Sequence, residues 1–598
     1  MTLAERTAPA DWFKPAWWPY WFGGMPLEFT YAPGFPLAIR EFASLSGCPV
    51  ARAFHIVVGL VFCAGPVALF VLARRLSGSA SYSFAAAIAY SLLAPTELIV
   101  PDAAFDLRHA TDARRFYLAF VWDEAPHLAA LALASIAIAC LHHAFETRKR
   151  VWMAVAGALM AAAVLTNTFG VTILAITLPL WALAFGETSQ RLALAASISI
   201  PAYLVASPWL PPSLLHALRV NANAYPESAW SARSWLGILA VVAACGFVLW
   251  LSRRWRDRAL RFFLLLAVVM SSIPVVDRFW KIHWVPQPGR YTSEMELALV
   301  LLVMFSVRWA GRRLAPRLLA MVLAAALAWP AAAVVIKHRR FAKSVLKPAD
   351  IEDSVEARVA RWVTEHPGSR IFAAGSIGQW LNLFSAEHQF GGGAFPTALN
   401  PIQQVALNGV YRPQPSDGAD ETVAWLKAFG ADRIVVTGPR SKEFWKPYER
   451  LDRFSDLTLL WQEDDTRIHQ VGTGSIAHLV PHPPRGPGDL RIYVAAIESS
   501  SPAGVLWEGS NRVRIRALSE SSSVLSVQIN YHRGWRAEVN GERREVHCDG
   551  LGQIWIDPAC SGPCEVILTY GGDWEAYMTR GLSGLTILGV LAWLGRRR

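Results

Sequence analysis

The sequence has few charged residues and lacks several short motifs of metal and phosphate sites. Asp, Glu, Lys and Arg make up only 17% of its 598 residues. It contains no His-Glu-x-x-His and no Cys-x-x-Cys, which excludes these two metal-binding patterns. Gly391-Gly392-Gly393 is not followed by Gly-Lys-Ser/Thr, so it predicts a flexible loop rather than a phosphate-binding loop. No basic segment leads into an apolar run near the start, so no signal peptide is predicted.

Long apolar runs are what the chain has instead, and hydrophobic residues make up 53% of it. Most runs approach the roughly 20 residues that a helix needs to cross a bilayer. The runs are 52–73, 82–100, 126–144, 151–167, 169–186, 192–210, 233–251, 260–276, 292–307, 316–336 and 576–594. This pattern predicts a polytopic α-helical membrane protein with about eleven transmembrane helices.

Alternate connections between the runs are rich in basic residues, and by the positive-inside rule these connections are cytoplasmic. The residues are Arg74, Arg75, Arg148, Lys149, Arg150, Arg191, Arg253, Arg254, Arg256, Arg258, Arg261, Arg308, Arg312, Arg313 and Arg317. The alternation predicts that 337–575 lies outside and that the Arg tail at 596–598 lies inside. The net charge of +11 sits mainly in these loops, where topology and anionic lipid headgroups explain it, so we exclude a nucleic-acid partner.

The polar part of the chain changes its pattern along its length. Apolar residues recur at helical spacing from Ile351 to Trp362 before a strand, and a second helix and strand follow, which predicts an α/β domain. Strand-like alternation and the hairpin turn Asn540-Gly541 predict a small all-β sandwich after it. The expected division is an aromatic-rich exoplasmic segment at 1–51, a multispanning domain at 52–336, an exoplasmic α/β domain at 337–488, an exoplasmic β-sandwich at 489–575, and a C-terminal helix with its tail at 576–598.

The N-terminal segment is dense in Trp and Tyr. Trp17, Trp18 and Trp21 suit a loop at the headgroup level, either as an aromatic belt or as the lining of an acceptor or lipid site. Trp-Pro-Tyr-Trp-Phe-Gly-Gly-Met-Pro at 18–26, followed by Tyr-Ala-Pro at 31–33, resembles the first outer loop of YfhO-like bacterial membrane proteins and of those with a 6-pyruvoyl-tetrahydropterin-synthase-related domain.

Both groups resemble the GT-C glycosyltransferases, and this resemblance implies a polyprenyl-phosphate sugar donor. In that class the loop follows a first membrane helix, and an acidic residue soon after the helix is the usual catalytic base. We therefore expect the chain to lack that upstream helix. Gly534-Trp535 and Val539-Asn540-Gly541 similarly resemble the terminal β-domain of YfhO-like proteins.

The predicted outer loop 101–125 carries the most polar residues between the runs. Its candidate catalytic residues are Asp102, Asp106, Asp123 and Glu124, with His127 just beyond them. Clustered carboxylates beside His and Arg suit general-base chemistry, a divalent metal or a sugar-hydroxyl site. The alternative is an ordinary solvated loop. Asp123, Glu124 and His127 are of most interest, because ionisable groups at membrane depth are costly unless they serve a function.

The predicted outer loop 277–291 contains the candidate phosphate site. Gln-Pro-Gly-Arg-Tyr, ending at Arg290 and Tyr291, resembles the donor-phosphate arginine region of GT-C enzymes. A guanidinium binds phosphate bidentately and keeps its charge. Lys281 and His283 could add to the same anion site. The alternative is that Arg290 only extends to the membrane interface.

Three of the cysteines outside the apolar runs lie near the C-terminal end of the predicted sandwich. Cys560 and Cys564 enclose a tight turn, and Cys548 precedes them by one strand. We predict a disulfide that involves Cys564, with either Cys560 or Cys548 as its partner.

These observations favour a bacterial inner-membrane glycosyltransferase that transfers a polyprenyl-phosphate-linked sugar to an envelope glycan or lipid on the exoplasmic side. The alternative is a non-catalytic membrane protein that binds or scaffolds such a glycan or lipid. A transporter is disfavoured, because few charged residues lie mid-membrane where a coupling site would be expected.

Overall fold

The protein is described here from a computed structural model. The described residues are 1–100, 109–223, 232–311, 316–347, 350–393, 395–412, 418–443, 445–448, 450–472, 474–519 and 523–596, with the side chains of 222–223, 316–330, 395 and 418–420 left aside. The chain forms two compact units. The helical unit comprises Ala32–Trp209, Tyr225–Pro348 and Gly581–Arg598, and the mixed unit comprises Met1–Tyr31, Leu210–Ala224 and Ala349–Arg580.

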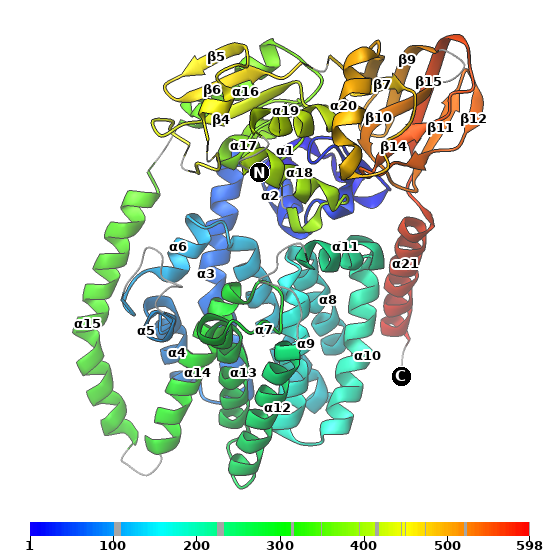
Figure 1. The fold of residues 1–598 in the computed structure, drawn as a ribbon. Coiled ribbons are helices and arrows are strands. Elements are labelled where there is room, and N and C mark those ends of the chain that lie inside the picture. Colours follow the sequence, from blue (N-terminus) through cyan, green and yellow to red (C-terminus); the bar gives the residue numbers. More distant parts are fainter. Residues whose placement is uncertain are drawn as a thin grey trace. The chain divides into compact units, whose positions relative to one another are not determined.

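The helical unit follows the apolar runs, and Figure 1 shows its long helices. Its helices are α2 (Gly34–Ser46), α3 (Val50–Ser77), α4 (Ala80–Leu92), α5 (Thr96–Ile99), α6 (Arg114–Phe120), α7 (Ala125–Thr147), α8 (Arg150–Thr166), α9 (Phe169–Phe185), α10 (Thr188–Ala206), α12 (Ala232–Ser252), α13 (Arg258–Trp280), α14 (Thr292–Gly311) and α15 (Pro316–Val345), with the 3-10 turns η4 (Ser207–Trp209) and η6 (Pro288–Tyr291). Helix α21 (Trp574–Gly595) begins in the mixed unit and ends in the helical unit.

Six helices of the described chain are long and apolar enough to cross a membrane: α3, α7, α10 with η4, α12, α13 and α21. Helices α8 and α9 are apolar but have 17 residues each. The run 82–100 is not the single helix that we predicted, because α4 ends at Leu92 and α5 begins only after Pro95. Proline disfavours a helical conformation at the residue before it, here Ala94. The chain is thus a multi-helix membrane protein, and the number of eleven spans stays a prediction.

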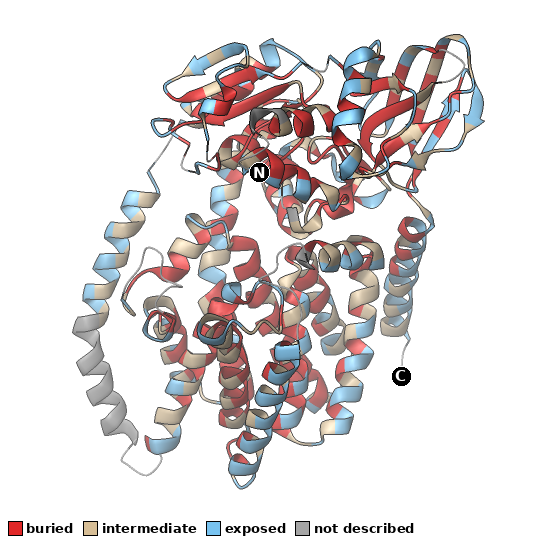
Figure 2. Cartoon of the chain, in the orientation of Figure 1, coloured by how far each residue is buried: buried red, intermediate tan, exposed pale blue. Residues whose placement is uncertain are grey.

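Helix α7 forms the interior of the helical unit. Of its apolar window 78% is buried, whereas 17% is buried in α12 and 6% in α21. Alanine lines much of α7, and small side chains allow neighbouring helices to approach closely. Figure 2 shows the difference, with α12 largely exposed. The N-terminal end of α7 is therefore surrounded by other helices.

In the mixed unit, the two predicted helix-then-strand pairs are α16 (Val355–Glu365) with β3 (Ile371–Phe372), and α19 (Gly418–Ala428) with β4 (Arg433–Thr437). Strands β3 and β4 are parallel, and β6 (Thr466–Gln470) and β5 (Leu459–Glu463) complete an antiparallel edge in the order β3-β4-β6-β5. Val359 and Val363 of α16 pack with Val435 and Ile468 of the sheet. The remaining helices of this region are α17 (Gly375–Phe384), α18 (Ile402–Tyr411) and α20 (Leu490–Ser499), with the 3-10 turns η7 (Ile351–Asp353), η8 (Phe395–Thr397), η9 (Asp452–Phe454) and η10 (Pro487–Asp489).

Two further sheets form a sandwich. One has the order β13-β14-β10-β7 and the other β12-β11-β15-β9-β8. Their bounds are β7 (Ala477–Val480), β8 (Gly504–Trp507), β9 (Arg512–Ser519), β10 (Val524–Asn530), β11 (Trp535–Val539), β12 (Glu542–Arg544), β13 (His547–Cys548), β14 (Gln553–Ile556) and β15 (Gly562–Tyr570). Val527 and Ile554 of the first sheet share one buried core with Val513 and Val566 of the second. Because β7 pairs with β10 in the first sheet, the sandwich begins before residue 489, the predicted start of this domain.

The N-terminal segment belongs to the mixed unit up to Tyr31. It contains α1 (Thr2–Arg6), the 3-10 turns η1 (Pro9–Phe13) and η2 (Leu27–Phe29), and a hairpin of β1 (Trp17–Trp18) and β2 (Met25–Pro26); α11 (Pro212–Asn223) is the other helix that joins this unit from outside its main segment. Hydrogen bonds from the Phe22 amide to the Gly391 carbonyl (3.0 Å) and from the Asn530 amide to the Gly23 carbonyl (3.2 Å) tie the hairpin into the unit.

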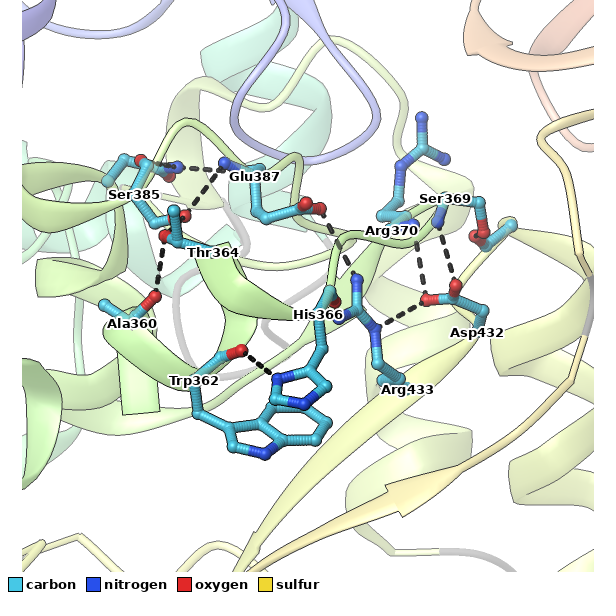
Figure 3. Close-up of polar contacts among 12 residues, drawn as sticks. Ala360, Trp362, Thr364, His366, Ser369, Arg370, Ser385, Glu387, Asp432 and Arg433 are labelled. Carbon is cyan, nitrogen blue, oxygen red and sulfur yellow. Dashed lines mark hydrogen bonds and ion pairs between the residues drawn. The ribbon is translucent and has the colours of Figure 1, made fainter. Parts of the chain in front are cut away.

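A polar cluster joins α16 to strands β3 and β4 of the mixed unit (Figure 3). Asp432 accepts from the amide of Ser369 at 2.8 Å and contacts Arg433 Nε at 3.1 Å. Arg433 also reaches Glu387 at 3.5 Å. Burial raises the pKa of Glu387 to about 7, and Arg433 opposes that rise. In Figure 3 the Arg370 side chain points away from Asp432; its guanidinium donates to the Phe429 and Gln528 carbonyls instead.

Candidate active site

Four ionisable side chains from three parts of the helical unit meet at the start of α7. The imidazole of His127 lies between two carboxylates: Nδ1 is 3.4 Å from Glu124 Oε2, and Nε2 is 2.6 Å from Glu294 Oε1. The other oxygen of Glu124, Oε1, is 3.4 Å from Arg290 Nε. We call Glu124, His127, Arg290 and Glu294 the Glu–His–Arg cluster.

Local sequence positions each member of the cluster. Glu124 is the N-cap of α7, and Pro126 occupies the first turn, where a missing amide proton costs nothing. His127 follows within that turn. Arg290 lies in η6, whose N-cap Gln287 has a φ of 49° and precedes Pro288. Glu294 lies in the first turn of α14, directly after η6.

Aromatic rings hold the cluster from one side. The imidazole of His127 stacks on Phe169 of α9, with ring centroids 4.7 Å apart. The Arg290 guanidinium lies over the same Phe169 ring, 5.8 Å from its centroid. Tyr291 is buried and packs edge-on against Phe169 at 5.3 Å. Rings in these positions restrict the orientations of His127 and Arg290.

Exposure differs sharply within the cluster. The side chains of His127 and Glu294 are 2% and 1% exposed, whereas Glu124 is 18% and Arg290 51% exposed. Next to Glu294, between α7, α9, α13 and α14, there is a cavity of about 20 Å³. Such a space holds about one water molecule and is too small for a sugar or a phosphate group. Arg290 and Glu124 are the more exposed members of the cluster, so they are the ones that a ligand can reach most readily.

A second buried network braces the start of α14. Arg114 of α6 contacts Glu97 of α5 at 3.3 Å and Glu296 at 2.9 Å, and it donates to the hydroxyl of Thr292 at 2.6 Å. All three ion-paired side chains are at most 5% exposed. Removing one partner would leave a buried charge unpaired, which is strongly destabilising. The network therefore holds the start of α14 in place, and with it Arg290 and Glu294.

The structure brings together four of the residues predicted as catalytic or phosphate-binding, namely Glu124, His127, Arg290 and Tyr291. Asp123 is exposed and directly precedes Glu124. Asp102 and Asp106 lie outside the described residues.

The other two residues predicted for the anion site, Lys281 and His283, belong to the loop after α13. His283 Nδ1 lies 2.6 Å from Asp277 Oδ1, so His283 has a carboxylate partner at the end of α13. Lys281 is exposed and is the C-cap residue of α13, where its amide donates to the Asp277 carbonyl at 2.9 Å.

The three tryptophans predicted to line an acceptor or lipid site are instead buried in the mixed unit. Trp17, Trp18 and Trp21 are 1%, 2% and 7% exposed. The ring of Trp17 packs on Trp535 and Tyr570 of the sandwich at 5.0 and 4.9 Å. Side chains this buried do not fit the predicted role of lining an acceptor or lipid site. An aromatic-rich segment can pack in a protein core as well as at the headgroup level, and here these side chains pack inside the mixed unit.

Near the end of the sandwich, Cys560 and Cys564 form a disulfide, and Cys548 is a free, exposed cysteine. In the part of the chain that the structure describes, no group of three or more His, Cys, Asp or Glu side chains could hold a metal ion.

Sequence reasoning did not single out Glu97, Arg114, Glu294 or Glu296 as site residues. A signal was present for two of them. Glu294 and Glu296 interrupt the apolar run 292–307 within six residues of Arg290. Carboxylates inside a membrane run are by default candidates for a functional site.

No protein-family model and no curated protein matches the chain. Among solved structures it is similar to the arabinofuranosyltransferase AftD from Mycobacteria, with 14% identity over 96% of this chain and 55% of that chain and a TM-score of 0.47. It is similar to the oligosaccharyltransferase AglB from Archaeoglobus fulgidus, with 10% identity, 73% and 64% coverage and a TM-score of 0.42. It is also similar to ArnT from Cupriavidus metallidurans, with 15% identity, 77% and 96% coverage and a TM-score of 0.37. The chain thus spans little more than half of AftD.

Proposed function

We propose that this protein is a membrane glycosyltransferase that takes a sugar from a polyprenyl-phosphate carrier and transfers it to an exoplasmic envelope glycan or lipid in the bacterial inner membrane. The observation that carries the proposal is the half-exposed Arg290, held in place by Glu124 and the Phe169 ring; the exposed carboxylate Asp123 directly precedes Glu124 in the chain. A reaction in which a phosphate leaves and a hydroxyl loses its proton needs a cation for the phosphate and a base for the proton, and these two side chains offer both.

Arg290 is suited to bind the phosphate of the donor. Its Nε faces Glu124, which leaves the two terminal nitrogens of the guanidinium on a side chain that is 51% exposed. A planar guanidinium offers phosphate two parallel N–H donors, and it stays charged throughout the reaction. As the bond between the anomeric carbon and the phosphate oxygen breaks, the negative charge that develops on the phosphate lies beside this cation.

Asp123 is suited to act as the base, because both oxygens of Glu124 already face other cluster members. The acceptor hydroxyl oxygen forms a bond to the anomeric carbon, and the proton of the hydroxyl passes to Asp123. The polyprenyl phosphate leaves from the opposite face of the sugar. Attack and departure on opposite faces invert the anomeric configuration.

Binding of a polyprenyl-phosphate sugar in nanodiscs tests the proposal. Arg290→Lys keeps the charge but not the planar fork, and we expect it to weaken binding about ten- to a hundredfold, as for the loss of a charge-assisted contact of about 1.5–3 kcal/mol. Arg290→Ala should weaken binding at least as much. Arg254→Ala is the matched control, because Arg254 is an exposed arginine that precedes the opposite end of α13.

Asp123→Asn separates transfer from binding. We expect this variant to bind the donor like the wild type but to lose transfer. Equal affinities of the wild type, Arg290→Lys and Arg290→Ala would remove Arg290 from the site and overturn the proposal. Donor binding that depends on Arg290, without transfer to any acceptor, would instead favour the non-catalytic binding protein.

A further inference from the structure

His127 is placed to act on the phosphate site without touching a ligand. Its side chain is 2% exposed, and it lies behind Glu124 as seen from the half-exposed Arg290. Both of its ring nitrogens face carboxylate oxygens, Nδ1 toward Glu124 and Nε2 toward Glu294. A carboxylate only accepts hydrogen bonds, so two carboxylates that face both ring nitrogens favour the doubly protonated imidazolium, which can donate from each nitrogen.

The two oxygens of Glu124 are divided between two cations. Oε2 faces His127 and Oε1 faces Arg290 Nε, each at 3.4 Å. Arginine and carboxylate otherwise prefer a bidentate pair, in which both oxygens meet two guanidinium nitrogens. Such a pair would occupy donors of Arg290 that a phosphate needs. Because the two oxygens are divided in this way, only Oε1 of Glu124 orients Arg290, and the other guanidinium nitrogens can still bind a phosphate.

We propose that His127 is a positioning residue that holds one oxygen of Glu124 away from Arg290 and so keeps the guanidinium open for a phosphate group. Glu294 holds the imidazolium from the other side, and Phe169 restricts its ring plane. The inference rests on the proposed function for the identity of the ligand, but the placement of Glu124 that it invokes can be measured without any ligand.

Two amide substitutions distinguish the contact made by Nδ1 from the contact made by Nε2. The amide nitrogen of Asn is as many bonds from Cβ as Nδ1 of histidine, and that of Gln as many as Nε2. His127→Asn therefore keeps a donor toward Glu124, and His127→Gln keeps one toward Glu294. Both variants remove the aromatic ring and the charge, so they are matched controls for loss of packing.

The first measurement is binding of a polyprenyl monophosphate, without sugar, to the full chain in nanodiscs. We expect His127→Asn to bind within about threefold of the wild type and His127→Gln about tenfold more weakly, as for one contact to a charged group. In the double variant His127→Gln with Glu124→Gln, the neutral side chain no longer competes for Arg290, and binding should recover most of the loss.

The second measurement needs no ligand. Phenylglyoxal reacts with accessible guanidinium groups, and mass spectrometry of peptides gives the rate at Arg290 with Arg254 as the internal reference. We expect His127→Gln to slow the reaction at Arg290 several-fold, because Glu124 then pairs with it bidentately, and His127→Asn to leave it near the wild-type rate. The double variant should restore the rate.

The outcomes separate this inference from the proposed function. Equal effects of the Asn and Gln variants, or a double variant that recovers neither binding nor reaction rate, would mean that His127 only packs, and would overturn the inference. If the wild type binds no polyprenyl phosphate, the proposed function fails, but the reaction rates at Arg290 still decide the role of His127.

Discussion

Asp549 shows how a single buried carboxyl makes the stability of the mixed unit depend on pH. Its side chain follows β13, and its Oδ1 accepts from the amides of Leu551 and Gln553, both at 2.8 Å. Burial raises its pKa from 3.8 to about 7, and these backbone hydrogen bonds oppose the rise. The folded state therefore binds a proton more tightly than the unfolded state. The contribution of Asp549 to the free energy of unfolding is therefore fully present below about pH 4 and is lost as the pH rises to about 7.

Asp549→Asn removes the cost of ionising this group. Oδ1 of Asn can keep both amide hydrogen bonds, but its new NH₂ group is buried where Oδ2 has no partner. We expect a gain of about 1–3 kcal/mol in the free energy of unfolding at pH 8 and little gain at pH 4. Denaturant unfolding of the full chain, followed at both pH values, measures this.

Asp557→Asn is the matched control, because Asp557 is an exposed carboxyl only eight residues further along the chain. It should leave the pH dependence unchanged. If Asp549→Asn has the same pH dependence as the wild type, the carboxyl of Asp549 ionises in the folded state as it does in water.

At the scale of elements, the β1–β2 hairpin contributes an N-terminal anchor to a sandwich formed near the C-terminal end of the chain. The amide of Trp17 donates to Asn511 at 2.7 Å, and its ring completes the sandwich core against Trp535 and Tyr570. Gly24, at a φ of 94°, passes so close to this ring that a Cβ there would lie 2.4 Å from Trp17 Nε1. The turn therefore needs glycine at this position, because a Cβ would collide with the ring and the positive φ disfavours other residues.

Trp17→Ala should lower the free energy of unfolding of the mixed unit by about 3–5 kcal/mol, because it leaves a cavity in a core that large rings fill. Unfolding monitored by limited proteolysis of the full chain measures the loss. Phe13→Ala is the control on the same segment, since Phe13 is 76% exposed and should change stability by less than about 0.5 kcal/mol. Equal sensitivity of the two variants would contradict the core role of Trp17.

At the scale of the whole molecule, the mixed unit constrains how many helices cross the membrane. Its three segments are Met1–Tyr31, Leu210–Ala224 and Ala349–Arg580. Because they fold into one compact unit, all three must lie on the same side of the membrane. An even number of spans must then separate consecutive segments. Of the six long apolar helices among the described residues, three lie between Tyr31 and Leu210; if all three cross the membrane, an odd number of further crossings is required there. The predicted runs satisfy the rule, with six between the first two segments and four between the next two.

The Arg-rich connections predict that the mixed unit lies outside and that the C-terminal tail lies inside. Protease added to right-side-out vesicles should cleave within 350–573, and protease added to inverted vesicles should leave this region intact while it removes a tag placed after residue 598. Cleavage of 350–573 only in inverted vesicles would reverse the predicted orientation.

What the sequence determines by itself here is local. Long apolar runs predict where α3, α7 and α13 lie, and alternation of apolar and polar residues predicts β9 and β11. These patterns can be read from the sequence because each follows from the geometry of a single helix or strand. Glu124 and His127 stood out as ionisable residues at the start of an apolar run, and Arg290 stood out through the resemblance of its Gln-Pro-Gly-Arg-Tyr stretch to GT-C enzymes.

Only the tertiary structure decided which of these residues meet. His127 and Glu294 are 167 positions apart, and their 2.6 Å contact depends on how α7 and α14 pack together. The same holds for Trp17. An indole ring suits a membrane interface and a protein core equally, and the burial of this ring in the sandwich depends on Trp535 and Tyr570, more than 500 residues away. Long-range pairing is a property of packing between elements, and the spacing of residues along one element carries no information about it.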